Sequence, residues 1–347
     1  MILQKKILYD LFRLTRIVLI PLIPFYLLLF KINQKIKKPL NPEIPVICAG
    51  NITTGGTGKT PAVIFIVKLL KELGYSPAVV SRGYGGLKSK IGAIVTDGKK
   101  IFLSPEEAGD ESYLMALNLN GVPIAVGKNR QQSIENLKQT FNIDIIVMDD
   151  GFQNYSIKKD ISVLVIDAVR PFGNGLLLPA GDLRETKTSL NRSDIILLNK
   201  SDLLTEHELI SLRKKISKIA PAVPIINSYY KIDSICRINN ISHKEKIDSI
   251  TGKKVLAISA IGNPDAFFMM IKKYNPGLLE SIIFPDHCWF RKSDINRFIN
   301  YSESCDYVIT TEKDYIKLME FDLNDRFFFL KIGMDISDNE VFRNYFI

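Results

Sequence analysis

The residues whose types and spacing point most directly to chemistry form a glycine-rich run, Thr53-Thr54-Gly55-Gly56-Thr57-Gly58-Lys59-Thr60. A short apolar segment precedes the run and a helical pattern follows it, which is the context of a phosphate-binding loop. Backbone N–H groups at such a helix start point toward phosphate oxygens. We expect the whole run to bind the phosphates of ATP, with Lys59 on the β- and γ-phosphates and the Thr60 hydroxyl on Mg²⁺. The competing interpretation is a flexible glycine-rich turn.

Two neighbouring carboxylates, Asp149 and Asp150, follow the apolar run Ile145-Ile-Val-Met148. Phosphotransferases with such a loop hold Mg²⁺ with a carboxylate at the end of a neighbouring strand. Acids after a buried strand also need a cation to offset their desolvation, although solvated turn acids would give the same pattern. We expect Asp149 and Asp150 to bind Mg²⁺ and to support catalysis. Asp167, after the next apolar run, is a weaker candidate.

Transfer of phosphate to a hydroxyl group needs a side chain that accepts the hydroxyl proton, and histidine or a carboxylate usually does so. The chain has three histidines, of which His287 lies in the run Phe284-Pro-Asp-His-Cys-Trp-Phe290. Asp110 lies in Gly109-Asp-Glu111, at the start of an expected helix. Each residue alone fits an ordinary structural role equally well, and sequence spacing does not show that the two meet.

Three arginines could hold a phosphate of the acceptor, because a guanidinium group binds phosphate through two parallel hydrogen bonds. They are Arg82 in a glycine-rich run, Arg130 at an expected helix start, and Arg184 in a loop with two glycine pauses. A surface role fits each of them as well. We therefore expect these arginines to lie at the acceptor side of the site, as candidates for binding the acceptor.

A competing signal is Asn199-Lys200-Ser201-Asp202, which matches the N-K-x-D pattern by which GTPases read guanine. The pattern follows an apolar run, as it does in those proteins. No D-x-x-G switch occurs where the carboxylate strand ends, because Asp149, Asp150 and Gly151 are adjacent. A regulatory P-loop GTPase is therefore the alternative to a phosphotransferase.

An α/β fold must position these residues, because from Glu43 onward short apolar runs alternate with longer amphipathic stretches. The alternation predicts a largely parallel sheet flanked by helices, as in P-loop NTPases. The expected strands are 45–49, 78–81, 122–126, 144–148, 161–166 and 194–198, and the expected helices are 60–73, 105–119, 130–141 and 206–219. A second series has expected strands at 254–260, 307–310 and 326–331 and a helix at 264–273.

The chain of 347 residues is long enough for two lobes. We expect an N-terminal membrane-interface anchor at 1–40 and a P-loop core at 41–224. A linker at 225–253, where the alternation breaks down, would join the core to a second, smaller α/β lobe at 254–347. This lobe is expected to contribute to the active-site cleft.

The N-terminal segment carries most of the net charge of +9, because residues 1–40 contain eight lysines and arginines against Asp10 alone. The rest of the chain is close to neutral, which argues against a nucleic-acid partner. Fourteen uncharged residues at 17–30, broken by Pro21 and Pro24, are fewer than the about 20 that span a bilayer. We expect a helix in the interface of an anionic membrane; the alternative is a helix packed on the protein's own core. Four scattered cysteines without a CxxC pair favour a reducing cytosol.

Taken together, the motifs resemble those of the tetraacyldisaccharide 4′-kinase family, the lipid A 4′-kinases of Gram-negative bacteria. The matching runs occur in the family's order up to about residue 318. They are Gly50-Asn-Ile-Thr-Thr-Gly-Gly-Thr-Gly-Lys-Thr-Pro61, Ser81-Arg-Gly-Tyr-Gly-Gly86, Gly109-Asp-Glu111, Asp149-Asp-Gly-Phe-Gln153, Phe172-Gly-Asn-Gly175, Leu178-Pro-Ala-Gly181, Leu183-Arg-Glu185, Asp286-His287 and Thr310-Thr-Glu-Lys-Asp314. The family's loop also begins with a residue like Thr53.

The resemblance implies transfer of the γ-phosphate of ATP to the 4′-hydroxyl of a tetraacylated glucosamine disaccharide 1-phosphate, which gives lipid IVA. It implies a peripheral enzyme on the cytoplasmic face of the bacterial inner membrane, with a P-loop α/β core and a second α/β lobe. Asp110 and His287 would act as a pair on the acceptor hydroxyl, and Asp149 and Asp150 would hold Mg²⁺ and support catalysis. We infer no obligate protein partner.

Gln153 ends the motif that contains the paired carboxylates, and we expect it to bind the acceptor together with the three arginines. The chain departs from the family's usual residues at Ser112, Asn154, Asp182 and Thr186. None of these departures removes a group that the chemistry requires.

Overall fold

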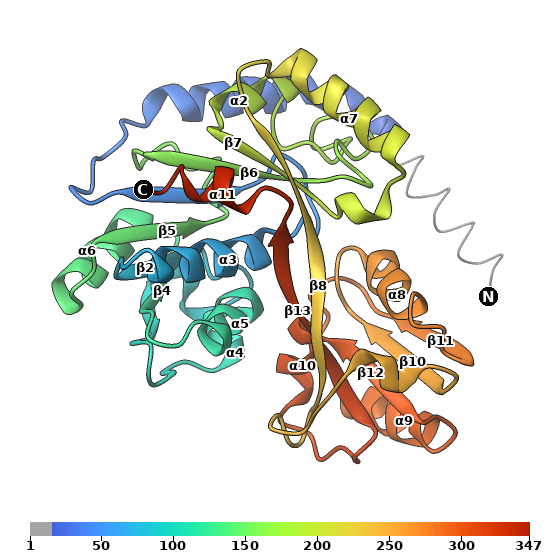
Figure 1. Ribbon diagram of the computed structural model, residues 1–347. Coiled ribbons are helices and arrows are strands. Elements are labelled where there is room, and N and C mark those ends of the chain that lie inside the picture. The colour runs from blue at the N-terminus through green and yellow to red at the C-terminus, as the bar shows by residue number, and fades with distance from the viewer. Residues whose placement is uncertain (1–15) are drawn as a thin grey trace.

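A computed structural model describes residues 16–347, which form two lobes (Figure 1). The larger lobe contains about the first two thirds of the chain, drawn in blue to yellow, and the smaller lobe contains most of the orange and red segments. Residues 1–15, with three of the basic residues of the expected anchor, lie outside the described residues.

The larger lobe is built on a sheet whose central strands are parallel. Its strands are β1 (Val46–Gly50), β2 (Pro77–Ser81), β3 (Ala93–Thr96), β4 (Ile124–Val126), β5 (Ile145–Asp149), β6 (Ile161–Asp167) and β7 (Ile195–Asn199). Only β3 runs antiparallel to its neighbour within this set. Every residue of β1, β2, β5 and β7 is buried, because parallel strands are covered on both faces and read as continuous apolar runs. The predicted α/β class and parallel sheet are confirmed.

Helices cover both faces of this sheet. They are α3 (Lys59–Glu72), α4 (Pro105–Ala108), α5 (Asp110–Asn118), α6 (Arg130–Thr140) and α7 (Glu206–Ile219), with short 3-10 turns η2 (Leu87–Lys90), η3 (Lys187–Arg192) and η4 (Ser201–Leu203). Along β1, Ile47 and Ala49 pack in the core cluster that contains α3, whereas Val46 and Cys48 pack in clusters on the other face. The apolar spacing of α3 therefore buries one side of that helix and fixes its N-terminus at the end of β1.

The single helix predicted at 105–119 is wrong, because the chain breaks at Gly109 into α4 and α5. Gly109 has a φ of 84°, and a Cβ at this position would lie 2.6 Å from the carbonyl oxygen of Tyr84. Only glycine fits both the backbone conformation and the close approach. As a result, Asp110 stands at the first position of α5 instead of inside a longer helix.

The segment predicted as an irregular linker at 225–253 contains the longest strand, β8 (Ile225–Arg237), followed by β9 (Lys244–Glu245) and η5 (Ile247–Ile250). The start of β8 pairs in parallel with β7, and the remainder pairs antiparallel with β13 (Phe327–Ile336). Figure 1 shows these two strands running from one lobe into the other. The prediction failed because β8 is only half buried, so its polar residues resemble a loop.

The smaller lobe contains a second parallel sheet with helices around it. Its further elements are β10 (Lys254–Ser259), α8 (Pro264–Lys272), β11 (Leu278–Ile283), α9 (Lys292–Ser302), β12 (Tyr307–Thr311) and α10 (Glu312–Leu318). The strands of the two lobes form one hydrogen-bonded series, in the order β11-β10-β12-β13-β8-β7-β6-β1-β5-β2-β4-β3, and β9 pairs with β8.

The last described element, α11 (Asn339–Arg343), returns to the larger lobe. The ring centroids of Phe342 and Phe65 in α3 are 5.9 Å apart, and Phe342 is fully buried. Met334 and Ile336 at the end of β13 belong to the same core cluster. The expected lobe at 254–347 therefore gives its last residues to the core of the larger lobe.

The N-terminal apolar segment forms η1 (Ile20–Leu22) and α2 (Ile23–Ile36), with Pro21 and Pro24 in their first turns. The helical stretch Arg16–Ile36 has 21 residues and a mean hydropathy of 1.7, which meets the length and composition of a membrane-crossing helix. A signal sequence near an N-terminus meets the same criteria. No residue of α2 is buried, whereas the alternative of a helix packed on the protein's own core requires a buried face. The helix still touches the lobe, since the Tyr26 hydroxyl donates to the carbonyl oxygen of Arg184 at 2.7 Å.

Candidate active site

The glycine-rich run connects β1 to α3 at the carboxyl end of the sheet. Gly55 and Gly58 have φ values of 99° and 98°, which glycine adopts without strain. The amides in the first turn of α3 have no partner within the helix, and the helix dipole favours an anion there. The Thr54 amide donates to the carbonyl oxygen of Asp182 at 2.7 Å, which ties the run to the loop after β6. The run therefore has the geometry that a phosphate cradle requires.

The N-K-x-D residues support this loop from behind. The side-chain amide of Asn199 donates to the Thr57 carbonyl oxygen at 2.9 Å. The Lys200 ammonium donates to the Gly56 carbonyl oxygen at 3.2 Å and forms a buried ion pair with Asp167. The Asp202 carboxylate pairs with Lys273 of the smaller lobe at 2.8 Å. In this structure the pattern holds the loop and bridges the lobes.

The paired carboxylates at the end of β5 differ sharply in environment. Burial raises the pKa of Asp149 to about 7, and the charges of Glu111 and Asp150 add to the effect. Its Oδ2 accepts a hydrogen bond from Ser81 at 3.0 Å, whereas its Oδ1 is buried without a hydrogen-bond partner. Burial also raises the pKa of Asp150, but the Lys59 and Arg184 charges outweigh it and hold that pKa below its ordinary value.

These groups fit a hard cation beside the phosphate cradle. Asp149 Oδ1 lacks a partner and would gain one from Mg²⁺, and the Thr60 hydroxyl lies at the start of α3 as an oxygen donor. Residues 16–347 contain no group of three His, Cys, Asp or Glu side chains suited to a metal. Mg²⁺ needs no such group, because it is usually held by one or two carboxylates together with phosphate oxygens.

The four residues that are candidates for binding the acceptor substrate have different surroundings. One guanidinium nitrogen of Arg184 contacts both oxygens of Asp150 at 2.9 Å, and Arg82 is exposed. Arg130 is buried and donates to the carbonyl oxygens of Gly127 and Asp149, and its burial lowers its pKa to about 10. The Gln153 amide donates to the Asn51 carbonyl oxygen at 2.7 Å and to Glu185. In this structure Arg130 and Gln153 therefore brace the backbone.

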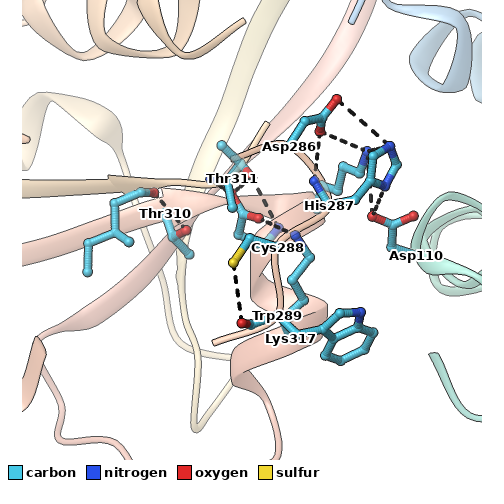
Figure 2. Close-up of polar contacts among 12 residues, drawn as sticks. Asp110, Asp286, His287, Cys288, Trp289, Thr310, Thr311 and Lys317 are labelled. Atoms are coloured by element: carbon cyan, nitrogen blue, oxygen red, sulfur yellow. Dashed lines mark hydrogen bonds and ion pairs between the residues drawn. The ribbon is translucent and has the colours of Figure 1, made fainter. Parts of the chain in front are cut away.

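Asp110 and His287 come together from the two lobes (Figure 2). The Nδ1 atom of His287, in the loop after β11, lies 3.0 Å from Oδ2 of Asp110. This hydrogen bond raises the pKa of His287 against the effect of burial. Burial raises the pKa of Asp110, but the hydrogen bond from His287 and the charge of Lys313 bring it to about 2. Asp110 is thus an anion that accepts the Nδ1 proton, and Nε2 lies 3.4 Å from the Lys313 ammonium.

A cavity of about 270 Å³ lies between the phosphate loop and the smaller lobe. It is lined by the loop residues 53–57, by Asp167, Arg170, Gly173 and Asp182 of the larger lobe, and by Gly262, Asn263 and Asp286 of the smaller lobe. Asp286 directly precedes His287, so the loop that carries this histidine borders the cavity. Both lobes therefore contribute to one site.

Sequence reasoning gave no individual role to Asn263, Asp286 or Lys313. Asn263 donates to Asp167 at 3.4 Å across the lobes, and Lys313 lies 3.5 Å from Asp110 Oδ2. Asp286 and Lys313 belong to motifs that the chain shares with the family, but a motif does not show which of its side chains point to the cleft. No sequence signal marked Asn263.

Comparisons with known proteins agree on one family. The model of LpxK, tetraacyldisaccharide-1-P 4′-kinase, matches residues 15–346. The tetraacyldisaccharide 4′-kinase of Halothermothrix orenii is 35% identical over 302 residues, covering 84% of this chain and 78% of that protein. The tetraacyldisaccharide 4′-kinase of Actinobacillus pleuropneumoniae serotype 5b is 34% identical over 321 residues, which is 90% of each chain.

A solved structure shares the fold. The structure of LpxK from Aquifex aeolicus in complex with ATP aligns with a TM-score of 0.72 and 24% identity, over 95% of this chain and 98% of that chain. These matches favour a kinase over a GTPase that reads guanine. The members of the tetraacyldisaccharide-1-P 4′-kinase family are ATP-dependent phosphotransferases that act on a hydroxyl group in lipid A biosynthesis. Because the family model covers nearly the whole described chain and the relatives exceed 30% identity, the chain belongs to this family.

Proposed function

We propose that the chain transfers the γ-phosphate of ATP to the 4′-hydroxyl of tetraacyldisaccharide 1-phosphate, with Asp110 and His287 activating that hydroxyl. The observation that carries the assignment is the 3.0 Å contact between His287 Nδ1 and Asp110 Oδ2 beside a cavity that the phosphate loop lines. Asp110 holds the imidazole so that Nε2 accepts the hydroxyl proton. A base is needed for transfer to a hydroxyl group.

On the nucleotide side, residues 53–60 hold the phosphates and Lys59 offsets their charge. The Thr60 hydroxyl and the carboxylates Asp149 and Asp150 would hold Mg²⁺. The cation, when bound, neutralises negative charge on the β- and γ-phosphate oxygens. Lys59 lies 3.7 Å from Asp150 Oδ1, so the ammonium already faces the acidic end of β5. Most of the rate enhancement then comes from alignment and charge neutralisation.

On the acceptor side, Arg82 is exposed, and Arg184 is partly exposed although it pairs with Asp150, so these two side chains would meet a sugar phosphate. Arg130 and Gln153 act indirectly by fixing the backbone of Asp149 and Asn51. This division assigns substrate contact to two of the four candidates.

The enzyme would work at the cytoplasmic face of the inner membrane as a peripheral protein. The exposed apolar side chains of α2 would enter the acyl boundary, and the lysines near its end, Lys31, Lys35, Lys37 and Lys38, would meet anionic headgroups. The four free cysteines are consistent with a reducing compartment. The acyl chains of the acceptor would then remain largely in lipid.

The test is incubation of the purified full chain with γ-labelled ATP and tetraacyldisaccharide 1-phosphate. His287→Ala should lower kcat by about 10²- to 10⁴-fold, the usual contribution of a general base, while ATP binding is unchanged. His243→Ala is the matched control, because His243 lies in the smaller lobe and contacts Glu245 instead of Asp110. Lys59→Ala should remove turnover through loss of nucleotide binding. Near-normal turnover of His287→Ala would contradict the assigned role.

A further inference from the structure

Lys313, in the motif Thr310-Thr-Glu-Lys-Asp314, extends from the smaller lobe into the Asp110–His287 pair. It is the second residue of α10, whose start is fixed because Thr311 Oγ1 accepts a hydrogen bond from the Asp314 amide at 3.1 Å. Its side chain is only 16% exposed. The Nζ atom lies 3.4 Å from His287 Nε2 and Glu111 Oε1, 3.5 Å from Asp110 Oδ2 and 3.7 Å from Asp286 Oδ1.

The environment of the imidazole is strongly acidic without this lysine. Asp110 contacts Nδ1, and Asp286 Oδ2 lies 3.8 Å from Nε2. Glu111 adds a third carboxylate, which lies on the ammonium of Lys313. Anions close to an imidazole favour its protonated form, and a protonated imidazole cannot accept a proton. The cluster therefore needs a cation if His287 is to act as a base near neutral pH.

We propose that Lys313 is a positioning residue for the phosphoryl transfer: its ammonium holds Asp110, Glu111 and Asp286 around His287 and favours the neutral, proton-accepting form of the imidazole. The proposal rests on the proposed role of His287 as the base. Lys313 touches Nε2, the nitrogen that receives the proton, so the acceptor hydroxyl enters beside the ammonium. The lysine acts through His287 and the three carboxylates and has no assigned contact with the substrates.

The direction of the effect follows from the charges that face His287. The carboxylates Asp110 and Asp286 stabilise the imidazolium, Glu111 lies on the Lys313 ammonium, and the Tyr84 ring lies 5.4 Å from the imidazole ring. The other charged groups of α10 nearby are Asp314 and Lys317, which pair with each other. The Lys313 charge lowers the pKa of His287, against the larger effect of the Asp110 hydrogen bond. Removing the ammonium should therefore raise that pKa further.

A second contact shows that α10 also joins the lobes. The Asn118 side chain of α5 donates to Glu312 Oε1 at 2.9 Å, next to Lys313. A loss of activity in a Lys313 variant could thus come from a weaker junction between α5 and α10. A junction defect would weaken the contact of Asp110, on α5, with His287 and so lower the pKa of His287, whereas loss of the ammonium alone raises it. The direction of the shift therefore separates the two causes.

The first experiment follows the imidazole Cε1–H resonance of His287 by NMR against pH in the full chain, in wild type, Lys313→Met and Lys313→Arg. The chain has three histidines, so His287→Ala assigns the signal. Lys313→Met should move the midpoint upward by about one pH unit, the scale of one neighbouring charge, and Lys313→Arg should restore it. Lys292→Met, at an exposed lysine that starts α9, should leave it in place. An unmoved midpoint in Lys313→Met overturns the proposal even if the protein is an active kinase.

The second experiment measures kcat against pH with ATP and tetraacyldisaccharide 1-phosphate. Lys313→Met should lower kcat at pH 7 by about tenfold, recover most of it at pH 9, and leave the KM for ATP within about twofold of wild type. A loss that is equal at all pH values overturns the proposal. The NMR titration needs no turnover, so a failure of the proposed kinase activity remains distinguishable from a failure of the Lys313 assignment.

Discussion

At the residue scale, the contact between Asp110 and His287 determines which imidazole nitrogen can accept a proton. The hydrogen bond and charge of Asp110 raise the pKa of His287, so the imidazole that we propose as the base becomes protonated as pH falls through that raised value. Asp110→Asn should lower kcat by about 100-fold and shift the acid limb of the kcat profile to lower pH. Glu106→Gln, at an exposed acid on α4, is the control. An acid limb of the kcat profile that does not shift in Asp110→Asn would contradict the role of Asp110 in the proposed pair.

The buried carboxylate Asp149 makes a prediction about stability. Its pKa of about 7 lies above its ordinary value of 3.8, so between these values the folded protein binds more protons than the unfolded one. The free energy of unfolding contributed by this group is therefore lost as pH rises through about 7. Without Mg²⁺ or ATP, the Tm of Asp149→Asn should fall less between pH 5.5 and 8 than the Tm of wild type, as measured by thermal melts. Asp248→Asn, at an exposed acid, should behave like wild type. Parallel pH dependences in all three proteins would contradict the raised pKa.

At the scale of elements, the turn between β1 and α3 depends on the absence of a side chain at Gly58. A Cβ there would lie 2.1 Å from the Asn199 side-chain nitrogen and 2.5 Å from the Tyr230 hydroxyl oxygen. Gly58→Ala should therefore weaken ATP binding by at least about tenfold, measured with a fluorescent nucleotide.

The control for this substitution is Gly74→Ala. Gly74 also has a positive φ, of 91°, but no atom lies within 4 Å of its Cβ position. Both variants force an alanine into a positive φ, which costs about 1–2 kcal/mol of stability, but only Gly58→Ala displaces the loop. Equal nucleotide affinity in the two variants would show that the close contact is unimportant.

The prediction that the protein binds a membrane surface rests on the exposed apolar side chains of α2. Phe25 is 60% exposed and Leu29 is 50% exposed, and burial of such side chains contributes about 1.5–3 kcal/mol each when complete. Phe25→Ser with Leu29→Ser should reduce binding to anionic vesicles by about tenfold or more, measured by sedimentation. Ile210→Ser is the control, because Ile210 is exposed on α7. Unchanged partitioning of the double variant would place membrane contact elsewhere.

At the scale of the whole molecule, β8 and β13 belong to the structure of both lobes, so we expect the lobes to unfold together. The single tryptophan, Trp289, lies in the smaller lobe, while ATP is expected on the loop of the larger lobe. MgATP should raise the midpoint of Trp289 fluorescence as much as that of far-UV circular dichroism, because ligand binding stabilises the whole cooperative unit. Lys59→Ala should show neither shift. Two separate midpoints would indicate independent lobes.

The sequence predicted the parts of the molecule whose physical causes are local. Buried parallel strands such as β1 and β5 give continuous apolar runs, and the phosphate loop has its own glycine pattern. The path of β8 could not be predicted, because half of its residues face solvent and its partner β13 lies about 100 residues later. The meeting of Asp110 with His287, 177 residues apart, was supplied by family resemblance and not by spacing. The break at Gly109 was missed because it depends on the approach of Tyr84 from another loop.

The return of α11 to α3 has a consequence for the order in which the protein is made. Phe342 and Phe346 complete the cluster that also holds Ile66 and Leu70 of α3, the helix that begins at the phosphate loop. The ribosome delivers these two phenylalanines only after it has made the entire smaller lobe. The nucleotide-binding half therefore cannot close its own core during synthesis before its partner has emerged, and a nascent chain stalled at residue 330 would expose that apolar face to chaperones.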